Sequence, residues 1–306
     1  MSSTDKTTQS PQAKRQSLKS HIKTEAARRG QSADRLTRQF LYQQFLALVF
    51  SYPDKRWILK GGVSLMMRLP AARHSMDVDL VARTPLDRDE AINALRQAIK
   101  PRSRENLLVF TLSPGKDESE GSQVVKLKVV VTFAGREYGT FSIDLALEPH
   151  LVAEEVEQIT PTPIVDVPWL PELPVIDVYP IADHVADKVC AMYEIHPVAR
   201  VSTRYRDLVD LALIVATYEL DAAPIARSLR SEEKRRQWLE ALPGELEVPA
   251  LAWRVGYRNA AAESPLPKEL VRLEDALAYV GEFLNPLLDG TRTTGIWNQA
   301  RGGWLD

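Results

Sequence analysis

The chain has 306 residues, a formal net charge of −2 and a sequence pI near 6.3, and 44% of its residues are hydrophobic. This composition is typical of a folded globular protein, so it excludes a disordered chain, and the small net charge means that any nucleic-acid partner must be held by local basic patches. Cys190 is the only cysteine, so an intrachain disulfide is excluded. No run of about 18 apolar residues occurs, and we expect a cytoplasmic protein without a membrane partner.

Residues 1–30 are predicted to form a mobile, basic N-terminal segment. Residues 1–13 are rich in Ser, Thr and Gln, and Lys14–Arg29 is a basic, helix-compatible stretch that we expect to be exposed to solvent, with RNA contact as the less favoured alternative. From Ala33 onward the spacing of apolar residues predicts an amphipathic helix, with Ser32 as its N-cap. This helix is expected to pack behind the first strand.

A strand, a glycine turn and the start of a helix are predicted next. The apolar run Trp57–Leu59 ends at Gly61 and Gly62, and residues 63–69 have helical composition. The unpaired N–H groups and the positive dipole end of such a helix attract anions, and the Ser64 hydroxyl could add a donor, which suits a triphosphate. A classical P-loop is excluded because Lys60 precedes the glycines instead of following them.

Two aspartates follow in an alternating pattern. Asp77 and Asp79 flank Val78 and precede Leu80, which predicts a strand with one buried face and with both carboxylates on the other face. Carboxylates, waters and phosphates are the ligands that Mg²⁺ prefers. Two such ions about 3.5–4 Å apart could activate an attacking hydroxyl and stabilise a leaving pyrophosphate. Either motif alone is common in proteins without this chemistry, so their combination carries the prediction.

The remaining pattern predicts a mixed sheet followed by helices. A helix is expected at Asp87–Ile99, and residues 161–180, rich in proline, are expected to be an extended connection that adds no strand to the sheet. Three strands are expected at Leu107–Leu112, Val124–Phe133 and Thr140–Leu147, and five later helices at Ile181–Tyr193, Tyr205–Tyr218, Ala223–Leu229, Glu232–Leu242 and Glu269–Leu288.

The strand at residues 140–147 offers a third carboxylate. Asp144, the only acidic residue of that predicted strand, would project opposite to Ile143 and Leu145 and could complete a metal site; an exposed strand face is the equal alternative. Lys126 and Lys128 would share one face of the preceding strand. They could line a groove for nucleotide or RNA phosphates, or they could be edge-strand lysines that discourage aggregation.

The run Lys60-Gly-Gly-Val-Ser-Leu65, followed by Arg73, Ser75, Asp77 and Asp79, resembles the signature of the AbiEii/AbiGii (MenT-like) family of nucleotidyltransferase toxins. Those toxins resemble the DNA polymerase β superfamily. Their later Asp-x4-Lys motif and downstream aspartate are matched by residues 183–188 and 204–211, so the resemblance spans roughly residues 35–220. It implies an α/β (α+β) fold: a polymerase β-like nucleotidyltransferase core with a mixed sheet at 31–160, a Pro-rich connection at 161–180 and a helical C-terminal domain at 181–306.

The resemblance also implies roles for individual residues. Lys188 resembles the active-site lysine of the family; without the family match, an exposed helix position paired with Asp187 or Glu194 would be favoured. Asp210 is the preferred match for the last aspartate, with Asp207 second, and the role of this residue would be to orient Lys188 or a metal-bound water. Arg73 and Ser75 would fix the loop or contact the γ-phosphate. In this assignment Lys60, Gly61, Gly62 and Ser64 hold the nucleotide, and Asp77, Asp79 and Asp144 hold metal, with help in activating the attacking hydroxyl as the other role implied for Asp144.

The implied activity is a nucleotidyl transfer that depends on Mg²⁺, for which Mn²⁺ could substitute. NMP would pass from NTP to an RNA acceptor, with the 3′ end of tRNA as the favoured target, and translation would be blocked. A cognate antitoxin encoded nearby is the expected partner in a toxin–antitoxin or abortive-infection pair. Two alternatives stay open: nucleotidyl transfer to a protein or an antibiotic, and a catalytically inactive regulator that binds nucleotide or RNA. A zinc site is excluded because five histidines and one cysteine never fall into ligand spacing.

Overall fold

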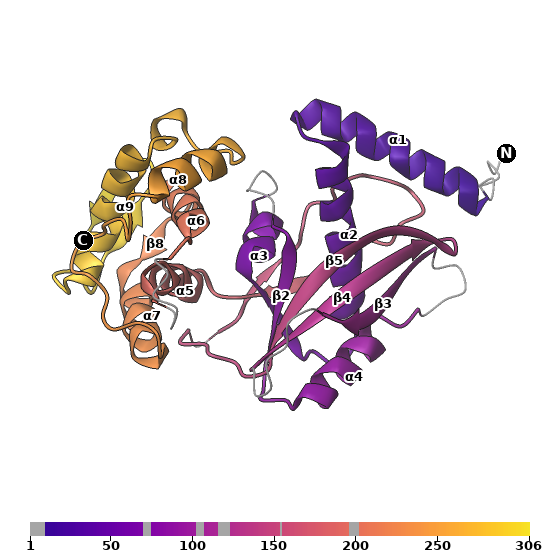
Figure 1. Cartoon of the computed structure of the whole chain (residues 1–306), viewed down its shortest axis with the longest axis horizontal. Coiled ribbons are helices and arrows are strands. Elements are labelled where there is room, and N and C mark those ends of the chain that lie inside the picture. Colours follow the sequence, from indigo (N-terminus) through magenta and orange to yellow (C-terminus); the bar gives the residue numbers. More distant parts are fainter. Residues whose placement is uncertain (1–9, 70–74, 102–106, 116–122, 154, 196–201) are drawn as a thin grey trace. The chain divides into compact units, whose positions relative to one another are not determined.

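The computed structural model describes residues 10–69, 75–101, 107–115, 123–153, 155–195 and 202–306. The chain divides into two compact units (Figure 1). The sheet unit comprises Met1–Leu59, Met76–Pro149 and Gln158–Asp177, and the helical unit comprises Lys60–Ser75, His150–Glu157 and Val178–Asp306. These units are not the continuous stretches suggested by the sequence, because two short segments from the first half of the chain group with the C-terminal helices. Residues 1–9 of the predicted mobile tail lie outside the described residues.

A mixed sheet of seven strands, in the order β3-β4-β5-β2-β1-β7-β6, confirms the predicted fold class. The strands are β1 Trp57–Lys60, β2 Asp77–Ala82, β3 Leu108–Pro114, β4 Val124–Phe133, β5 Arg136–Ala146, β6 Glu157–Ile159 and β7 Ile176–Val178. Strand β2 runs parallel to β5, and β4 runs antiparallel to both β3 and β5. Ala134 and Gly135, both with positive φ, form the two-residue turn between β4 and β5, which suits the twist of a long hairpin.

Aromatic packing joins the sheet to helix α2 (Ala33–Phe50). Phe45 of α2 meets Phe110 and Phe141 edge-on, with ring centroids 5.7 and 5.5 Å apart. Ser32 caps α2 as predicted, because its hydroxyl accepts a hydrogen bond from the backbone N–H of Arg35. Helix α4 (Arg88–Ala98) also contacts α2, and its start is fixed by the capping box that Asp87 and Glu90 form.

Helix α1 (Pro11–Arg29) is less solvated than its composition suggests. Leu18, Ile22 and Ala26 are buried, and the helix contacts α2. These three residues recur every four positions, so even a basic helix with few large apolar residues has one face that can pack. The expectation of a fully solvated stretch was therefore wrong.

Strand β7 corrects the prediction that residues 161–180 add no strand to the sheet. Its three residues are buried beside β1 in the sheet, and the segment is short enough to fit before Pro180. Asp177 at its centre is buried, accepts a hydrogen bond of 2.7 Å from the Gln158 side chain and pairs with Arg83 at 2.6 Å. The prolines flank β7 without interrupting it. The buried carboxylate of Asp177 is tolerated because it has hydrogen-bond and ion-pair partners.

The helical unit contains α3 Gly61–Arg68, α5 Ile181–Tyr193, α6 Tyr205–Thr217, α7 Ala222–Arg235, α8 Trp253–Ala262 and α9 Leu273–Leu288. Helices α5, α6 and α9 follow the predictions closely. The two helices expected between residues 223 and 242 are instead the single helix α7, and the expected start at Glu269 is a 3-10 turn, Lys268–Leu270, that precedes α9. Helix α8 was not predicted. Among the described residues, no helix is long and apolar enough to cross a membrane.

A three-stranded sheet was also missed. It consists of β8 Leu220–Asp221, β9 Ile296–Asn298 and β10 Gly303–Leu305, in the order β10-β9-β8. Trp297 of β9 is fully buried and donates a hydrogen bond of 3.0 Å from Nε1 to the carbonyl oxygen of Val215 in α6. Strands of two or three residues carry too little periodicity to be recognised in a sequence, and here the tryptophan provides most of the packing.

The only cysteine should be unreactive in the folded protein. Cys190 on α5 is fully buried, and burial raises the pKa of its thiol to about 12. Since the thiolate is the reactive form, we expect no modification by a disulfide reagent at pH 8 and one modified thiol per chain in denaturant. Timed absorbance measurements with Ellman's reagent would test this, and native labelling as fast as that of a small free thiol would contradict the packing.

Candidate active-site residues

Three aspartates share one face of the mixed sheet. Asp79 of β2 lies opposite Asp144 of β5 in the parallel register, and Asp77 lies opposite Ser142. All three aspartates are half-buried, whereas the alternating residues Val78 and Leu80 are fully buried. Because residues opposite one another on paired strands project to the same face, the structure places the three carboxylates on one surface, as the alternation predicted.

Strand β5 begins earlier than predicted and therefore contains a second acidic residue, Glu137. This residue is exposed and lies beyond the register shift between Val131 and Thr132. Asp144 is therefore not the only carboxylate of its strand, but it is the one in register with Asp79.

Two lysines extend the carboxylate face. Lys126 of β4 lies opposite Asp144 and Lys128 lies opposite Ser142, and both lysines are exposed. Their interpretation as edge-strand lysines is wrong, because β4 lies between β3 and β5 in the sheet. A face that carries carboxylates on β2 and β5 and cations on β4 could serve both a metal-bound nucleotide and a phosphate chain.

The donor chemistry of this face fits a hard divalent cation. Among the described residues, no group of three or more His, Cys, Asp or Glu side chains is arranged to hold a metal ion. Mg²⁺ is commonly held by one or two carboxylates together with substrate phosphates and waters. Asp77 and Asp79 on one strand face match this mode of binding.

Tyr42 of α2 is a neighbour of these carboxylates that the sequence did not reveal. Burial raises the pKa of its hydroxyl well above the ordinary value; Arg38 lowers the pKa, and the charges of Asp77 and Asp79 raise it further. The ring packs edge-on against Phe141 at 5.0 Å. A tyrosine in an apolar helix stripe gives no sequence signal of this electrostatic contact.

The glycine turn belongs to the helical unit and starts a helix directly. Lys60 is extended, Gly61 has a φ of 67°, and α3 begins at Gly61, two residues before the predicted start. Glycine enters the left-handed region without strain, so its amide can belong to the first turn of the helix. Ser64 is fully buried, and its Oγ has no hydrogen-bond partner within the described part of the chain. Ser75 is also buried, and Arg73 lies outside the described residues.

Helix α3 is tied to the start of α5. Lys60 places its Nζ 5.7 Å from the centroid of the Tyr179 ring, and Arg68 donates a hydrogen bond of 3.0 Å to the carbonyl oxygen of Tyr179. Arg68 also pairs with Glu157 at 2.6 Å, and Glu157 accepts a hydrogen bond of 2.7 Å from the backbone N–H of Ile181. Both ends of α3 are thereby connected to the residues that lead into α5.

Lys188 of α5 is a buried cation held by two carboxylates. Its Nζ lies 2.8 Å from Oδ1 of Asp207 and 2.6 Å from Oδ2 of Asp210, both on α6. The lysine and Asp210 are almost completely buried, and Asp207 is slightly more accessible. A cation held in this way has a fixed position and is well suited to act on a charged ligand.

The alternative interpretation of Lys188 as an exposed residue is wrong. Asp187 and Glu194, its expected partners in that case, bind Arg236 at 2.6 and 2.9 Å instead. Burial would raise the pKa of Asp187, but the charges of Lys60 and Arg236 outweigh it, so the pKa lies well below the ordinary value. Asp187 therefore remains ionised beside Lys188.

Asp183, the first residue of the Asp-x4-Lys motif, forms hydrogen bonds that hold a neighbouring segment in place. Its Oδ2 accepts hydrogen bonds of 3.1 and 3.2 Å from the backbone N–H groups of Val152 and Ala153, and its Oδ1 accepts one from the Ser228 hydroxyl. The aspartate thus fixes the segment that precedes β6 onto α5. Arg204, at 3.8 Å from Asp207, is largely exposed and contributes a weak contact.

His184, one turn before Lys188, should make the protein sensitive to acid. It is fully buried, and burial lowers its pKa from 6.5 to about 3, with a smaller contribution from Lys188. The His184 imidazole is therefore protonated below about pH 6.5 in the unfolded chain, but only below about pH 3 in the folded chain. Neutral His184 makes its full contribution to the free energy of unfolding above pH 6.5. Between pH 6.5 and pH 3 this contribution falls by about 1.4 kcal/mol for each pH unit.

We expect the variant His184→Leu to reduce the loss of unfolding free energy between pH 7 and pH 5 by about 2 kcal/mol relative to the original protein. Urea unfolding at the two pH values measures this difference. Equal pH dependence in both proteins would contradict the buried, neutral state of the imidazole.

Comparison with known families identifies the family to which the chain belongs. The sequence model described as "Nucleotidyl transferase AbiEii toxin, Type IV TA system" matches residues 44–279, which is more than half of the chain. The chain belongs to the AbiEii toxin family. Its members are nucleotidyltransferases, so the resemblance inferred from the glycine turn and the Asp-x-Asp strand is confirmed.

The fold of the chain is similar to that of solved structures. MenT4, a nucleotidyltransferase toxin from Mycobacterium tuberculosis H37Rv, shares 19% identity with this chain at a TM-score of 0.53, covering 86% of this chain and 98% of MenT4. A structure titled "Crystal structure of putative nucleotidyltransferase from H. pylori" has a TM-score of 0.48 at 17% identity, covering 83% of this chain and 98% of its own. No curated protein matches the chain.

Proposed function

We propose that this AbiEii-family enzyme transfers NMP from an NTP to the 3′ hydroxyl of an RNA, with tRNA as the acceptor, in a reaction that requires Mg²⁺. The family match supports nucleotidyl transfer, and the in-register carboxylates on β2 and β5 support metal-dependent chemistry. The RNA 3′ hydroxyl attacks the α-phosphorus, the bond to the bridging oxygen breaks, and pyrophosphate leaves. Modified tRNA would no longer serve translation, which accounts for a toxin controlled by a cognate antitoxin.

In this proposal Asp77 and Asp79 hold the divalent cation, for which Mn²⁺ could substitute. The bound ion supplies charge neutralisation at the phosphates and lowers the pKa of the attacking hydroxyl. Asp144, which lies in register with Asp79, accepts the proton from that hydroxyl. This is one of the two roles that the resemblance implies for Asp144, the other being that of a metal ligand.

The triphosphate is bound by groups of the helical unit. The amides of Gly61 and Gly62 at the start of α3 face the anion, and Lys60 adds positive charge. Ser64 donates its unpartnered hydroxyl, and Lys188, fixed by Asp207 and Asp210, stabilises charge on the leaving pyrophosphate. Because these groups are held before the substrate arrives, catalysis consists mainly of positioning and charge stabilisation.

The exposed lysines favour a polyanionic acceptor over a small neutral one. Lys126 lies beside Asp144 in the antiparallel register, and Lys128 lies two residues further along the same face. A strand that presents cations next to the proposed base can hold the phosphates that precede a 3′ hydroxyl.

Incubation of the purified protein with Mg²⁺ and each of the four α-³²P-labelled NTPs tests the proposal. Total tRNA, a mixture of aminoglycosides, and a cell extract treated with ribonuclease are offered as acceptors in parallel. We expect label on tRNA alone. Label only on protein or antibiotic would overturn the RNA acceptor, and binding of NTP without labelled product would support an inactive regulator instead.

A further inference from the structure

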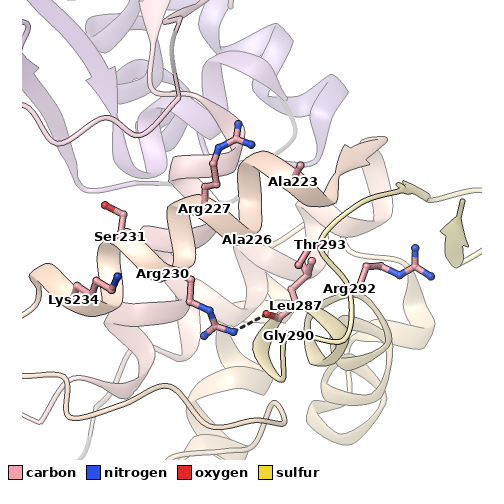
Figure 2. A pocket seen from close by; sticks show the side chains of 10 residues that line it. All are labelled: Ala223, Ala226, Arg227, Arg230, Ser231, Lys234, Leu287, Gly290, Arg292 and Thr293. Carbon is pink, nitrogen blue, oxygen red and sulfur yellow. Dashed lines mark hydrogen bonds between the residues drawn. The ribbon is translucent and has the colours of Figure 1, made fainter.

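A basic pocket lies on the helical unit, between α7 and the segment that follows α9 (Figure 2). The cavity has a volume of about 530 Å³. Its lining is mainly cationic and hydroxylic, and the residues used below are Arg227, Arg230, Ser231, Lys234, Gly290 and Arg292. None of them belongs to the residues assigned to nucleotidyl transfer.

The α7 side of the pocket is a stripe along one helix face. Arg227, Arg230, Ser231 and Lys234 are separated by three, one and three positions, so they are neighbours on the helix surface. Arg230 is fixed in place, because its Nη2 donates hydrogen bonds of 3.2 and 2.7 Å to the carbonyl oxygens of Leu287 and Leu288 at the end of α9. This contact also lies favourably at the negative end of the α9 dipole.

A second fixed cation stands on the other side of the pocket. Arg292 donates from Nη1 to the carbonyl oxygen of Thr294 and to the carboxylate of Asp306, each at 3.1 Å. Its guanidinium lies 5.3 Å from the centroid of the Trp304 ring, which restricts it further. Gly290, with a φ of 79°, lies between the end of α9 and Arg292.

Two further cations have no counter-charge. Arg227 and Lys234 are exposed, and neither has an ion pair or hydrogen bond with any residue that the structure describes. Glu233 of α7 pairs with Arg230 at 3.4 Å. The pocket therefore combines two fixed and two unpaired cations in a chain whose formal net charge is −2.

We propose that this pocket binds the phosphate backbone of the acceptor RNA. Guanidinium, ammonium and hydroxyl groups are suited to phosphate oxygens, and most protein contacts to a nucleic-acid backbone are of this kind. Leu287 is the only large apolar residue of the lining, whereas a protein partner would need apolar or aromatic anchors. The inference rests on the proposed function only for the identity of the RNA.

The test compares two double charge reversals of equal size. Arg227→Glu with Lys234→Glu removes the two unpaired cations, and Arg258→Glu with Lys268→Glu reverses two exposed cations elsewhere on the helical unit as the matched control. Binding of fluorescently labelled tRNA is measured by anisotropy at several salt concentrations without NTP. We expect the pocket variant to bind about tenfold or more weakly, with a log–log salt slope reduced by about 1.5, since each lost phosphate contact reduces it by about 0.7–0.9.

The control variant should bind like the original protein. Equal tRNA affinity in all three proteins, or an equal loss in both variants, would overturn the pocket assignment. A labelled poly-glutamate peptide is measured in parallel: if the pocket variant loses the peptide and keeps tRNA, the pocket serves an acidic protein and the RNA assignment fails.

Transfer assays separate this inference from the proposed function. On tRNA, the pocket variant should have a raised KM and an unchanged kcat, because the lost contacts act on binding. If tRNA is never labelled but the pocket variant loses tRNA binding, the pocket assignment stands and the acceptor assignment fails. If tRNA is labelled with the same KM and affinity in both proteins, the pocket assignment fails and the proposed function stands.

Discussion

Asp79→Asn should reduce nucleotidyl transfer on the order of 10³-fold or more, because a bound divalent cation contributes several kcal/mol of transition-state stabilisation. The substitution keeps the size of the side chain and its place opposite Asp144 while removing the charge that a metal needs. Initial rates with labelled NTP and tRNA measure the loss. Asp77→Asn is expected to behave similarly, since both residues share the strand face.

The matched control for Asp79→Asn is Asp89→Asn on the exposed surface of α4, which should retain full activity. Both variants should unfold within a few degrees of the original protein, because each loses one charge that is not fully buried. Transfer by Asp79→Asn at more than a tenth of the original rate would contradict the metal role of the carboxylate. Restoration of its rate by high Mn²⁺ concentration would support that role.

Lys188→Met should both destabilise the protein and abolish transfer. Removing the cation leaves Asp207 and Asp210 buried without their partner, and breaking a buried pair in this way costs about 3–5 kcal/mol. Asp210→Asn should cost more than Asp207→Asn, because Asp210 is completely buried and Asp207 is more accessible. Urea unfolding measures these differences, with Lys268→Met on the exposed surface as the control.

A triple variant separates the two roles of Lys188. Lys188→Met combined with Asp207→Asn and Asp210→Asn leaves no unpaired buried charge, so we expect it to regain most of the lost stability. Transfer should stay absent, because the cation that acts on the triphosphate is still missing. Recovery of activity together with stability would show that the lysine has a structural role only.

The sequence predicted the elements that carry strong local signals. The Gly-Gly turn and the Asp-x-Asp alternation depend on backbone geometry and on a period of two, so β1, α3 and β2 were placed within two residues. The helices α5 and α6 were likewise evident from their apolar spacing. The partnership of Lys188 with Asp207 and Asp210 was anticipated through the family resemblance, whereas helical spacing alone favoured an exposed lysine.

Features that depend on tertiary packing were not predictable. Strand β7 has three residues between prolines and becomes a strand because β1 pairs with it, and α7 continues through the position where composition suggested a break. The influence of Asp77 and Asp79 on Tyr42 requires knowledge of which helix covers the sheet. The basic pocket joins α7 to residues about sixty positions later, a distance that no local pattern spans.

The intact mass of one purified tRNA, measured after incubation with Mg²⁺ and each NTP in turn, tests the central claim most directly. The account predicts a mass increase of one or more NMP units with at least one nucleotide. No increase should occur with a 3′-deoxy tRNA or with Asp79→Asn. An unchanged tRNA mass with all four NTPs, in a preparation shown to be folded and able to bind tRNA, would contradict NMP transfer to the tRNA 3′ end.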